Sequence, residues 1–253
     1  MRVRQYRFDD TIRLFNIGDL HRGDKCCDVK AFHRVVEEVR RSDDAFWVST
    51  GDLLNVALKT SLSDCYSSLS LEDEKHELIK ELSPIAHKCL GFVGSNHHRR
   101  LSNATGLNLD KVIANELKIP YLGKIGLINV TCGRASYFIA MHHGTGGGKR
   151  RGGKVNNLED LASLIPGADV YMEGHTHAFA HFIDEHPYID RKRNIFSSHP
   201  AHFITTGHYL KWDDSYAQDY KLRPMPIGSS IIQLFANGVG VGKNKMVKVD
   251  FFQ

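Results

Sequence analysis

The sequence predicts a layered α/β fold, and two observations lead to this prediction. In the first half, short apolar runs alternate with amphipathic segments of helical period, whereas the second half consists mainly of strand-like runs. The chain has 253 residues, 42% of them hydrophobic and 25% charged, which is ordinary for a soluble globular protein. It is long enough for one large core and shows no repeat or linker, so we expect one domain spanning residues 1–253.

The first elements form a strand–helix–strand unit. Residues 13–17 are apolar enough for a short buried strand. Apolar residues then recur with helical period between Val29 and Val39, and Asp28 can cap the helix expected over residues 28–41. A second strand is expected over residues 45–50. Two strands joined in this way form a parallel pair with a right-handed crossover.

The rest of the chain alternates between further helices and strands. A helix is expected over residues 72–88, ended or kinked at Pro84, and a strand follows at Cys89–Val93. Two more helices are expected, at Leu109–Leu117 and at residues 157–165. The other predicted strands are 126–131, 135–141, 168–172, 178–183, 202–206, 229–235 and 246–251.

The composition argues against a membrane protein and against a disulfide framework. No window approaches the ~20 apolar residues of a membrane span, and the basic N-terminus lacks the apolar segment of a signal peptide. The five cysteines are irregularly spaced, and Cys26 and Cys27 are adjacent, so neither disulfides nor a CxxC zinc pattern is expected. We therefore expect reduced thiols in a cytoplasmic protein.

Charge and histidine content indicate the kind of chemistry. The net charge of +4 suits a phosphate-bearing substrate but does not by itself indicate nucleic-acid binding. Histidine is the anomaly, with 15 residues in the chain against a usual share on the order of 2%. Several histidines lie beside Gly, Asn or Asp rather than on apolar faces, which favours metal or acid–base chemistry over packing.

Residue types that bind metals follow five of the predicted strands. Asp19 and His21 follow the first strand, and residues i and i+2 of an extended segment point to the same side, so both can meet one ion. The other four strand ends carry Asp52, Asn96-His97, His142-His143 and His175/His177. Sites in open α/β sheets lie at such carboxyl ends. A lone Gly-Asp usually marks a turn, but five successive coincidences favour one shared site.

These residues resemble the calcineurin-like metallophosphoesterase family, block by block and in the expected order. The matching blocks are Asp19-Leu20-His21 (D-x-H), Gly51-Asp52-Leu53-Leu54-Asn55 (GDxx(D/N)), Asn96-His97 (the core of GNH(E/D)), His142-His143-Gly144 (the single-histidine block) and Gly174-His175-Thr176-His177 (GHxH). The resemblance spans residues 19–177 and implies a layered α/β/β/α sandwich that holds two divalent metal ions.

The resemblance also implies a role for each ligand. By this resemblance, one metal would be bound by Asp19, His21 and His177. The other would be bound by Asn96, His175 and one histidine of the His142/His143 pair. Asp52 would bridge the two metals. Strand alternation lets only one histidine of the pair point into the site. We prefer His142 because it directly follows the strand, and His143 stays open. Mixed nitrogen and oxygen ligands permit Mn, Fe, Zn or Ni, with Mn preferred.

His97 is the expected catalytic residue. It is not needed as a ligand, so it could protonate the leaving alkoxide or stabilise charge on the phosphoryl oxygens, the alternative being a core histidine. The third block departs from the family at two positions, with Ser95 directly before Asn96 and His98 where Glu or Asp is usual. The usual acidic residue orients its neighbouring histidine, so here His97 would be oriented from elsewhere in the fold.

Basic residues near the blocks are the expected substrate contacts. The glycine-rich loop over residues 145–154 either cradles phosphate oxygens, with Lys149, Arg150 or Arg151 as anion contacts, or is a solvated basic loop. Arg99 and Arg100 are likewise either phosphate contacts or solvated charges. We select Arg99, Lys149 and Arg150 as substrate-binding residues.

The expected function is a dinuclear-metal phosphoesterase. The family implies that two metals clamp the phosphoryl group and ionise a bridging water, and this bridging hydroxide attacks in line. A phosphodiester is favoured because the basic loop could hold an extended anionic substrate, with a nucleotide or nucleic acid among the candidates. The alternatives are a phosphomonoesterase, a nuclease acting on DNA or RNA, and a non-catalytic metal-binding scaffold, for which His98 is the sequence argument.

Overall fold

A large mixed sheet lies at the centre of the protein. The computed structural model describes residues 3–58, 61, 69–146, 150–236 and 245–253. The strands within these residues are β1 (Arg4–Phe8), β2 (Ile12–Asn16), β3 (Ala45–Ser49), β4 (Cys89–Val93), β5 (Tyr121–Gly123), β6 (Ile125–Cys132), β7 (Ala135–His142), β8 (Val170–Glu173), β9 (Phe179–Asp190), β10 (Ile195–His208), β11 (Gly228–Leu234) and β12 (Val247–Phe252).

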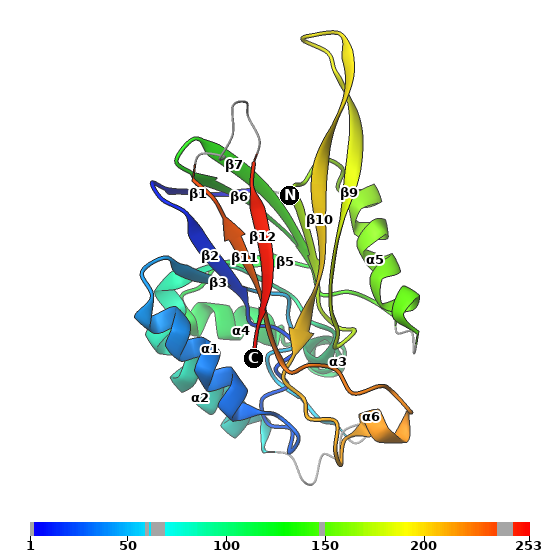
Figure 1. Cartoon of the computed structure of the whole chain (residues 1–253). Helices are drawn as coiled ribbons and strands as arrows, with labels where there is room; N and C mark the ends of the chain where they lie inside the picture. The colour runs from blue at the N-terminus through cyan, green and yellow to red at the C-terminus, as the bar shows by residue number, and fades with distance from the viewer. Residues whose placement is uncertain (1–2, 59–60, 62–68, 147–149, 237–244) are drawn as a thin grey trace.

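The sheet consists of two halves that meet at a narrow seam. The strand order is β1-β6-β7-β8-β10-β11-β2-β3-β4-β5, with β9 added to β10 and β12 added to β11. At the seam, β10 and β11 share only the facing pairs Gly207–Ser229 and His208–Gly228 among the described residues. Strands β2, β3, β4 and β5 run parallel (Figure 1). This confirms the parallel pair predicted for β2 and β3, which a helical crossover joins.

Alternation along the strands divides the buried side chains into three clusters, which define four layers. Leu14, Val48 and Met172 belong to the cluster between the two halves of the sheet. Their sequence neighbours face outward: Phe15 and Trp47 pack against the helices of one side, and Tyr171 packs against the helix of the other. The order of layers is therefore α/β/β/α, which confirms the predicted fold class.

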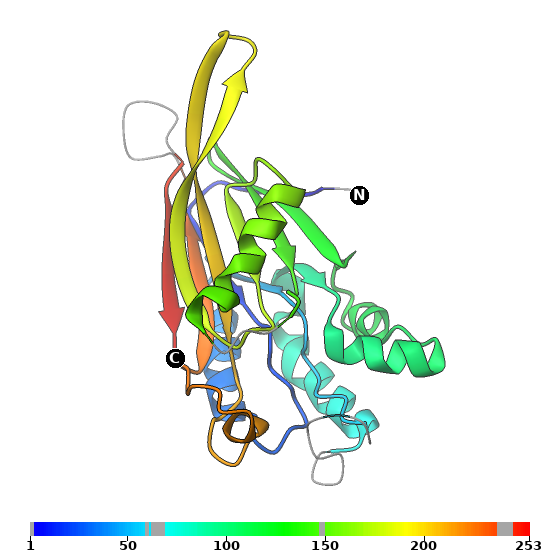
Figure 2. The ribbon, with the colours of Figure 1, turned by 90° about the vertical axis from the view of Figure 1, so that its right-hand side faces the viewer.

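The helices cover the two outer faces of this arrangement. On one side lie α1 (Val29–Arg41), α2 (Leu71–Leu82) with its 3₁₀ continuation η1 (Ser83–Lys88), and α4 (Leu109–Leu117). On the other side lies α5 (Arg151–Leu164) (Figure 2). As predicted, the Asp28 side chain caps α1, here by accepting from Ala31 N, and Pro84 marks the end of the regular α2 helix. None of the helices among the described residues is long and apolar enough to cross a membrane.

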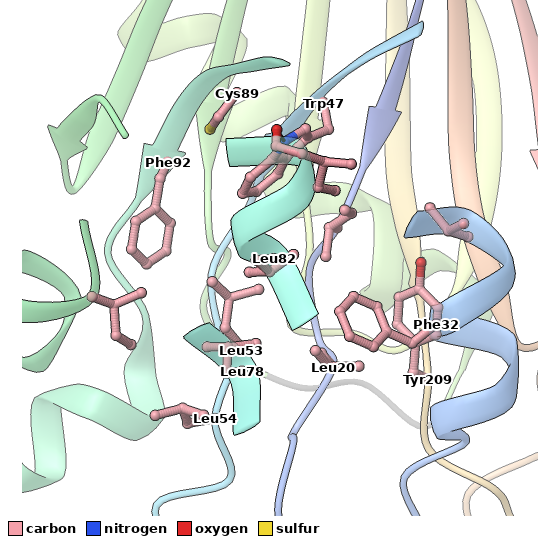
Figure 3. Close-up of a cluster of buried hydrophobic side chains, with 14 of the residues drawn as sticks. Leu20, Phe32, Trp47, Leu53, Leu54, Leu78, Leu82, Cys89, Phe92 and Tyr209 are labelled. Carbon is pink, nitrogen blue, oxygen red and sulfur yellow. Dashed lines mark hydrogen bonds between the residues drawn. The ribbon is translucent and has the colours of Figure 1, made fainter. Parts of the chain in front are cut away.

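The core on the α1–α2 side is built from large, fully buried side chains. Phe32, Leu78 and Leu82 come from the helices and Trp47 from β3, and each is 0% exposed (Figure 3). Burying a side chain of this size stabilises the fold by roughly 1.5–3 kcal/mol. Trp47 also donates from Nε1 to Ile85 O at 2.7 Å, so its polar atom is not left unpaired. This core fixes the positions at which β2 and β3 end.

Several elements differ from the sequence prediction. The strands β1 and β5 and the helices α3 (Asn96–Thr105) and α6 (Tyr216–Asp219) were not predicted. Helix α3 has only one buried side chain, His98, so its sequence carries no apolar period. Helix α5 begins at Arg151 instead of residue 157, although Gly152 and Gly153 are poor helix formers. Packing of its later turns against the sheet outweighs that local preference.

Strands β9 and β10 form a long hairpin that extends beyond the layered body (Figures 1 and 2). The two strands pair continuously from Phe179–Thr206 to Asp190–Ile195. The sequence analysis predicted strands only at residues 178–183 and 202–206, which lie at the end of the hairpin next to the layered body. The outer part is largely exposed on both faces, so it lacks the apolar alternation by which strands are recognised.

Candidate metal centre

Five of the predicted ligands, Asp19, His21, Asp52, His175 and His177, converge at the carboxyl ends of strands from both halves of the sheet. The ligand atoms of Asp19, His21 and His177 lie within 4.8 Å of one another. The same holds for a second group, Asp52, His143 and His175, and for a third group, His21, Asp52 and His97. The groups share His21 and Asp52 and so form one continuous cluster. Asp19 and Asp52 follow β2 and β3, whereas His143 and His175 follow β7 and β8.

A left-handed backbone aims five of these side chains into the cluster. The φ angles are 47° at Asp19, 50° at His21, 49° at Asp52, 65° at His175 and 47° at His177. Such values are uncommon for residues other than glycine. The sequence argument for Asp19 and His21 assumed an extended segment, and this geometry is wrong, although the two side chains do meet. Hydrogen bonds from Asp19 N to Gly51 O and from His21 N to Asp52 O, both 3.0 Å, hold the turn instead.

His143, and not His142, faces the cluster. Its Nε2 lies 2.9 Å from Asp52 Oδ2, and its side chain is 3% exposed. His142 lies on the opposite side of the strand end, where its Nδ1 accepts from Gly144 N at 3.0 Å and lies 3.2 Å from Glu173 Oε1. The reason is the pleat of β7, because His143 continues the face of Ile139 and Met141, which points between the halves of the sheet. We therefore replace His142 by His143 in the proposed ligand set.

The two buried aspartates are held by backbone N–H groups. Asp52 Oδ1 accepts from His97 N at 3.0 Å, and Asp19 Oδ2 accepts from His175 N at 2.8 Å. Gly174 makes the second contact sterically allowed, because a Cβ at this position would lie 2.5 Å from Asp19 Oδ2. Each aspartate keeps one oxygen directed at histidine nitrogens: Asp52 Oδ2 toward His143, and Asp19 Oδ1 at 3.7 Å from His177 Nε2.

Carbonyl and hydroxyl groups outside the cluster orient its imidazole rings. His143 Nδ1 lies 2.8 Å from Thr50 O, and His97 Nδ1 lies 2.7 Å from Asn55 O, so in both rings Nδ1–H donates to a carbonyl. Tyr216 Oη lies 3.3 Å from His177 Nδ1. Engaging Nδ1 leaves Nε2 directed into the cluster, which is the usual arrangement around metal-binding histidines. Consistent with this, the Nε2 atoms of His21 and His177 lie 3.0 Å apart.

Burial governs the protonation of the cluster. It lowers the pKa values of His21 and His177 well below the usual value, and it lowers the pKa values of His97 and His175 as well. These imidazoles are therefore neutral at pH 7, the form that binds metals. Burial also raises the pKa of Asp19 to about 7.

Asp52 and His143 form the charged pair of the cluster. Burial would raise the pKa of Asp52, but His143 and His97 hold it well below its usual value. Burial opposes the charge on His143, but Asp52 and Asp19 more than offset this and raise its pKa to about 9. The positive charge of His143 therefore stabilises the buried carboxylate of Asp52 in its ionised form.

The cluster fits divalent metal ions. Among the described residues, no Lys or Arg pairs with Asp19 or Asp52, although both are at most 1% exposed. Asp19 Oδ1 is buried and has no hydrogen-bond partner within the described part of the chain. Buried carboxylates and unpaired polar atoms are costly unless a cation compensates them. A set of imidazole nitrogens and carboxylate oxygens is the donor set of Mn, Fe, Zn or Ni.

Comparison with solved structures identifies the fold. The structure is similar to the crystal structure of the calcineurin-like phosphoesterase YfkN from Bacillus subtilis, with a TM-score of 0.50 and 12% sequence identity over 96% of this chain and 91% of that one. The chain has the calcineurin-like phosphoesterase fold.

Two other solved structures are similar over most of this chain. One is Vps29 from Chaetomium thermophilum, with a TM-score of 0.45 and 14% identity over 95% of this chain and 96% of that one. The other is the NAD nucleotidase NadN from Haemophilus influenzae, with a TM-score of 0.44 and 11% identity over 95% of this chain and 50% of that one. No protein-family model and no curated protein sequence matches the chain.

A contact between two helices positions the segment from Ser95 to His98. Asn96 and His97 begin α3, whose first turn is capped by Ser95. His98 replaces the usual acidic residue, and its Nδ1 lies 2.5 Å from Oδ1 of Asp110 on α4. Ser95 N and Ser95 Oγ also donate to the Asp110 carboxylate, both at 3.3 Å. A carboxylate from another helix therefore fixes the start of α3, and Asn55 O orients His97.

The residues predicted to contact the substrate are Arg99, Lys149 and Arg150, and the two that the structure describes do not form one group. Arg99 lines a cavity next to Asn96 but is exposed. Arg150 is exposed and lies just before α5, and Lys149 falls outside the described residues. Among the described side chains of this segment, Lys154 reaches the cluster, and its Nζ donates to Thr176 O at 2.9 Å.

His208 is a further residue at the cluster that the sequence argument missed. Its ring stacks on His177, with 5.2 Å between centroids. Burial lowers its pKa to about 4. The sequence did contain a signal for it, because the predicted strand 202–206 is also followed by a residue type that binds metals, in Gly207-His208. This repeats the pattern of the other five strand ends.

Proposed function

We propose that this chain is a metal-dependent phosphoric ester hydrolase with two divalent ions, and that it favours phosphodiesters. The observation that supports it most strongly is the cluster itself. Asp and His side chains from both halves of the sheet converge there on buried carboxylates that have no Lys or Arg partner among the described residues. Left-handed backbone at five of these residues adds to this, because strain of this kind gathers at functional sites.

The proposed ligand sets follow the geometry of the cluster. Asp19, His21 and His177 would hold one ion. Asn96, His143 and His175 would hold the other, and Asp52, which lies between the two groups, would bridge them. Two bound ions would supply Lewis-acid activation of a water and neutralise charge on the phosphoryl group. Manganese is our first choice of metal.

His97 is the proposed catalytic acid. Its Nδ1–H donates to Asn55 O, so in the neutral ring Nε2 is free to take up a proton and would pass it to the leaving oxygen. The residue lines an open cavity beside the cluster and is within reach of a bound ester. Its main-chain N–H also anchors Asp52. His97 thus connects the expected bridging ligand to the side on which the leaving group would lie.

Turnover assays test this function. Purified protein stripped with a chelator and reloaded separately with Mn, Fe, Zn or Ni is assayed with bis(p-nitrophenyl) phosphate and p-nitrophenyl phosphate. We expect hydrolysis of the diester that is lost with the chelator, restored by Mn, and abolished in Asp52→Asn. Circular dichroism of that variant checks its fold. Cleavage of the monoester alone would contradict the diester preference, and no turnover with any metal would favour a non-catalytic scaffold.

Two further proposals go with this function. Salt-dependent binding and cleavage of single-stranded DNA or RNA would indicate a nuclease rather than an enzyme for small diesters. We also propose a cytoplasmic location, which is supported by the free thiols of all four described cysteines, Cys26, Cys27, Cys89 and Cys132.

A further inference from the structure

Two cavities open beside the metal cluster. The first, here called the aromatic cavity, has a volume of about 350 Å³ and reaches His97, His175 and His177. The second, here called the polar cavity, has a volume of about 260 Å³ and reaches Asn96 and His143. A molecule bound at the cluster therefore has room to extend in two directions.

The loop between β10 and β11, residues 209–227, supplies the wall of the aromatic cavity. Its apolar side chains there are Leu210, Trp212, Tyr216, Tyr220, Leu222 and Met225. The wall is held in place before any ligand binds. Trp212 Nε1 donates to Leu222 O at 2.7 Å, and Lys211 N donates to Cys26 O at 2.8 Å. Rings fixed in this way lose little freedom on binding.

Cationic side chains line the same cavity. They are Arg100, Lys154, Lys211 and Arg223. Arg100 comes from α3, close to His97, and Lys154 is held against Thr176 O. An aliphatic chain would gain little from the cations, and a purely anionic group would gain little from the rings. An aromatic ring attached to a phosphate uses both.

The polar cavity has a different chemistry. Hydrogen-bonding side chains from α3, α4 and nearby segments line it: Ser95, Asn96, Asn103, Asn108, Asp110 and Lys124. It offers both donors and acceptors in a small space, which suits an arm that carries several hydroxyl groups.

We propose that the substrate is an unsymmetrical phosphodiester, with an aromatic alcohol in the aromatic cavity and a hydroxyl-rich alcohol in the polar cavity. This rests on the proposed function. A phosphomonoester has one arm and would leave one cavity unused, whereas a diester fills both. His97 lines the aromatic cavity, so the aromatic alcohol is the leaving group.

The reaction then balances as a simple hydrolysis. The oxygen of one water forms a bond to phosphorus while the bond from phosphorus to the aromatic alcohol's oxygen breaks. That oxygen keeps the bonding electron pair and takes a proton through His97 Nε2, and the water's remaining proton ends on the solvent or the product. The products are the free aromatic alcohol and the phosphomonoester of the hydroxyl-rich alcohol.

Product analysis tests which bond breaks. The Mn-loaded protein is incubated with the mixed diester 2-phenylethyl glyceryl phosphate and, separately, with diglyceryl phosphate. We expect 2-phenylethanol and glycerol phosphate from the mixed diester, with a KM about tenfold below that of diglyceryl phosphate, as expected for stacking plus burial of a ring. Release of glycerol and 2-phenylethyl phosphate would overturn the assignment of the two cavities.

Matched variants test the aromatic wall. Trp212→Ala and Tyr220→Ala should each raise KM for the mixed diester about tenfold and have a clearly smaller effect on diglyceryl phosphate, so that the ratio of the two kcat/KM values falls. The control is Tyr188→Ala in the β9–β10 hairpin, because Tyr188 and Tyr220 are equally exposed, at 45%. A Tyr188→Ala protein should match the wild type with both diesters. Equal effects of Tyr220→Ala on the two diesters would overturn the proposal while leaving the phosphoesterase function intact.

Fluorescence gives a binding measurement that does not need turnover. The chain has two tryptophans: Trp47, which is fully buried, and Trp212, which lines the aromatic cavity. We expect 4-nitrobenzyl phosphate to quench the emission saturably in the wild type and not in Trp212→Phe. Unsaturable or equal quenching in both proteins would contradict an aromatic binding site. Saturable quenching without hydrolysis of any ester would instead refute the catalytic function and, with it, the assignment of a leaving group.

Discussion

Asp19, His21, Asp52, His175 and His177 all adopt a left-handed backbone that residues with a Cβ avoid. A residue in this conformation costs roughly 1–2 kcal/mol relative to the right-handed one. Ten of the described residues other than glycine have a positive φ, and these five make up half of them. Their concentration at one cluster, where the left-handed backbone aims ligand atoms at one point, is the pattern expected when function outweighs local stability.

Histidine 143 provides the sharpest test of the proposed ligand set. His143→Ala removes a nitrogen that lies 2.9 Å from Asp52 Oδ2, so we expect loss of about one bound metal ion and a fall in activity of about 100-fold or more. His142→Ala is the matched control, because its side chain faces Glu173, and it should keep both ions. Metal analysis of the dialysed proteins measures this. The reverse result would restore His142 as the ligand.

Glu74 predicts a pH dependence of stability outside the metal cluster. It is 1% exposed on α2, and its Oε2 accepts from Val56 N at 3.1 Å. Burial raises its pKa from 4.5 to about 7. The folded state therefore holds this proton more tightly than the unfolded chain, and the resulting stability is lost as the pH rises from about 4.5 through about 7.

Glu74→Gln removes this titration. The free energy of unfolding of the variant relative to wild type should grow by roughly 3 kcal/mol between about pH 4.5 and about pH 8. Urea unfolding in a chelator, at several pH values, measures the difference without a contribution from metals. A difference that stays flat across this range would show that Glu74 is ionised in the folded protein as easily as in the unfolded one.

At the scale of single residues, the types and order of the metal ligands were readable from the sequence, whereas their directions were not. Asp19 and His21 were paired by the alternation of an extended strand, but a left-handed turn brings them together. His142 was chosen for its nearness to the strand end. Its neighbour faces the cluster because Tyr137, Ile139 and Met141 mark the inner face of β7, a distinction that became clear only once the opposing layers were known.

Helices α3 and α4 act as a pair that positions the third block. Asp110 on α4 accepts hydrogen bonds from Ser95 and contacts His98, so one carboxylate ties down the first turn of α3, from which Asn96 and His97 extend. Asp110 thus fixes the first turn of α3, whereas the orientation of the His97 ring comes from Asn55 O. This arrangement makes the block depend on a contact between helices.

Asp110→Ala tests that dependence. It leaves the buried His98 Nδ1 without its partner, which should cost about 1–3 kcal/mol in the free energy of unfolding and lower kcat at saturating metal. Glu116→Ala on the same helix is the control. That residue pairs with Lys75 at the surface, so its loss should cost at most about 1 kcal/mol and leave kcat unchanged. Equal effects of the two changes would show that Asp110 has no special role.

Elements that bury most of their apolar side chains were predictable, and elements that bury few side chains were not. Helix α1 has the expected bounds because its apolar residues recur with helical period and Asp28 caps it. Strand β4 has them because it is a short run that is buried throughout and ends at a polar turn. Helix α3 and the outer part of the β9–β10 hairpin bury few side chains, so burial leaves no pattern in their sequences.

The candidate metal centre joins the two halves of the whole molecule. Asp19 and Asp52 extend from the half that contains β2 and β3, and His143 and His175 extend from the half that contains β7 and β8. Direct strand pairing between these halves is limited to the two pairs of the seam among the described residues. Bound metal would therefore cross-link the halves beside the seam, where His208 stacks on His177.

Removal of metal should lower the stability of the whole protein. A ligand at about 100 times its Kd stabilises the folded state by about 2.7 kcal/mol, which corresponds to several degrees of Tm for a chain of this size. Differential scanning fluorimetry with and without a chelator measures the shift. Asp52→Asn should show a much smaller shift than the wild type. An equal shift in both proteins would mean that the stabilising metal binds elsewhere.

The loop that lines the aromatic cavity leaves the sheet after His208 and re-enters it at Gly228, and these two residues face each other across the seam. A loop with adjacent ends can change length cheaply, since each doubling costs about 0.6 kcal/mol in closure entropy. Insertions or exchanges there would leave the strand ends that carry Asp19, Asp52 and His143 in place. Evolution, or a protein engineer, can therefore alter what this scaffold accepts by changing one continuous segment, provided that Tyr216, whose Oη lies 3.3 Å from His177 Nδ1, is kept.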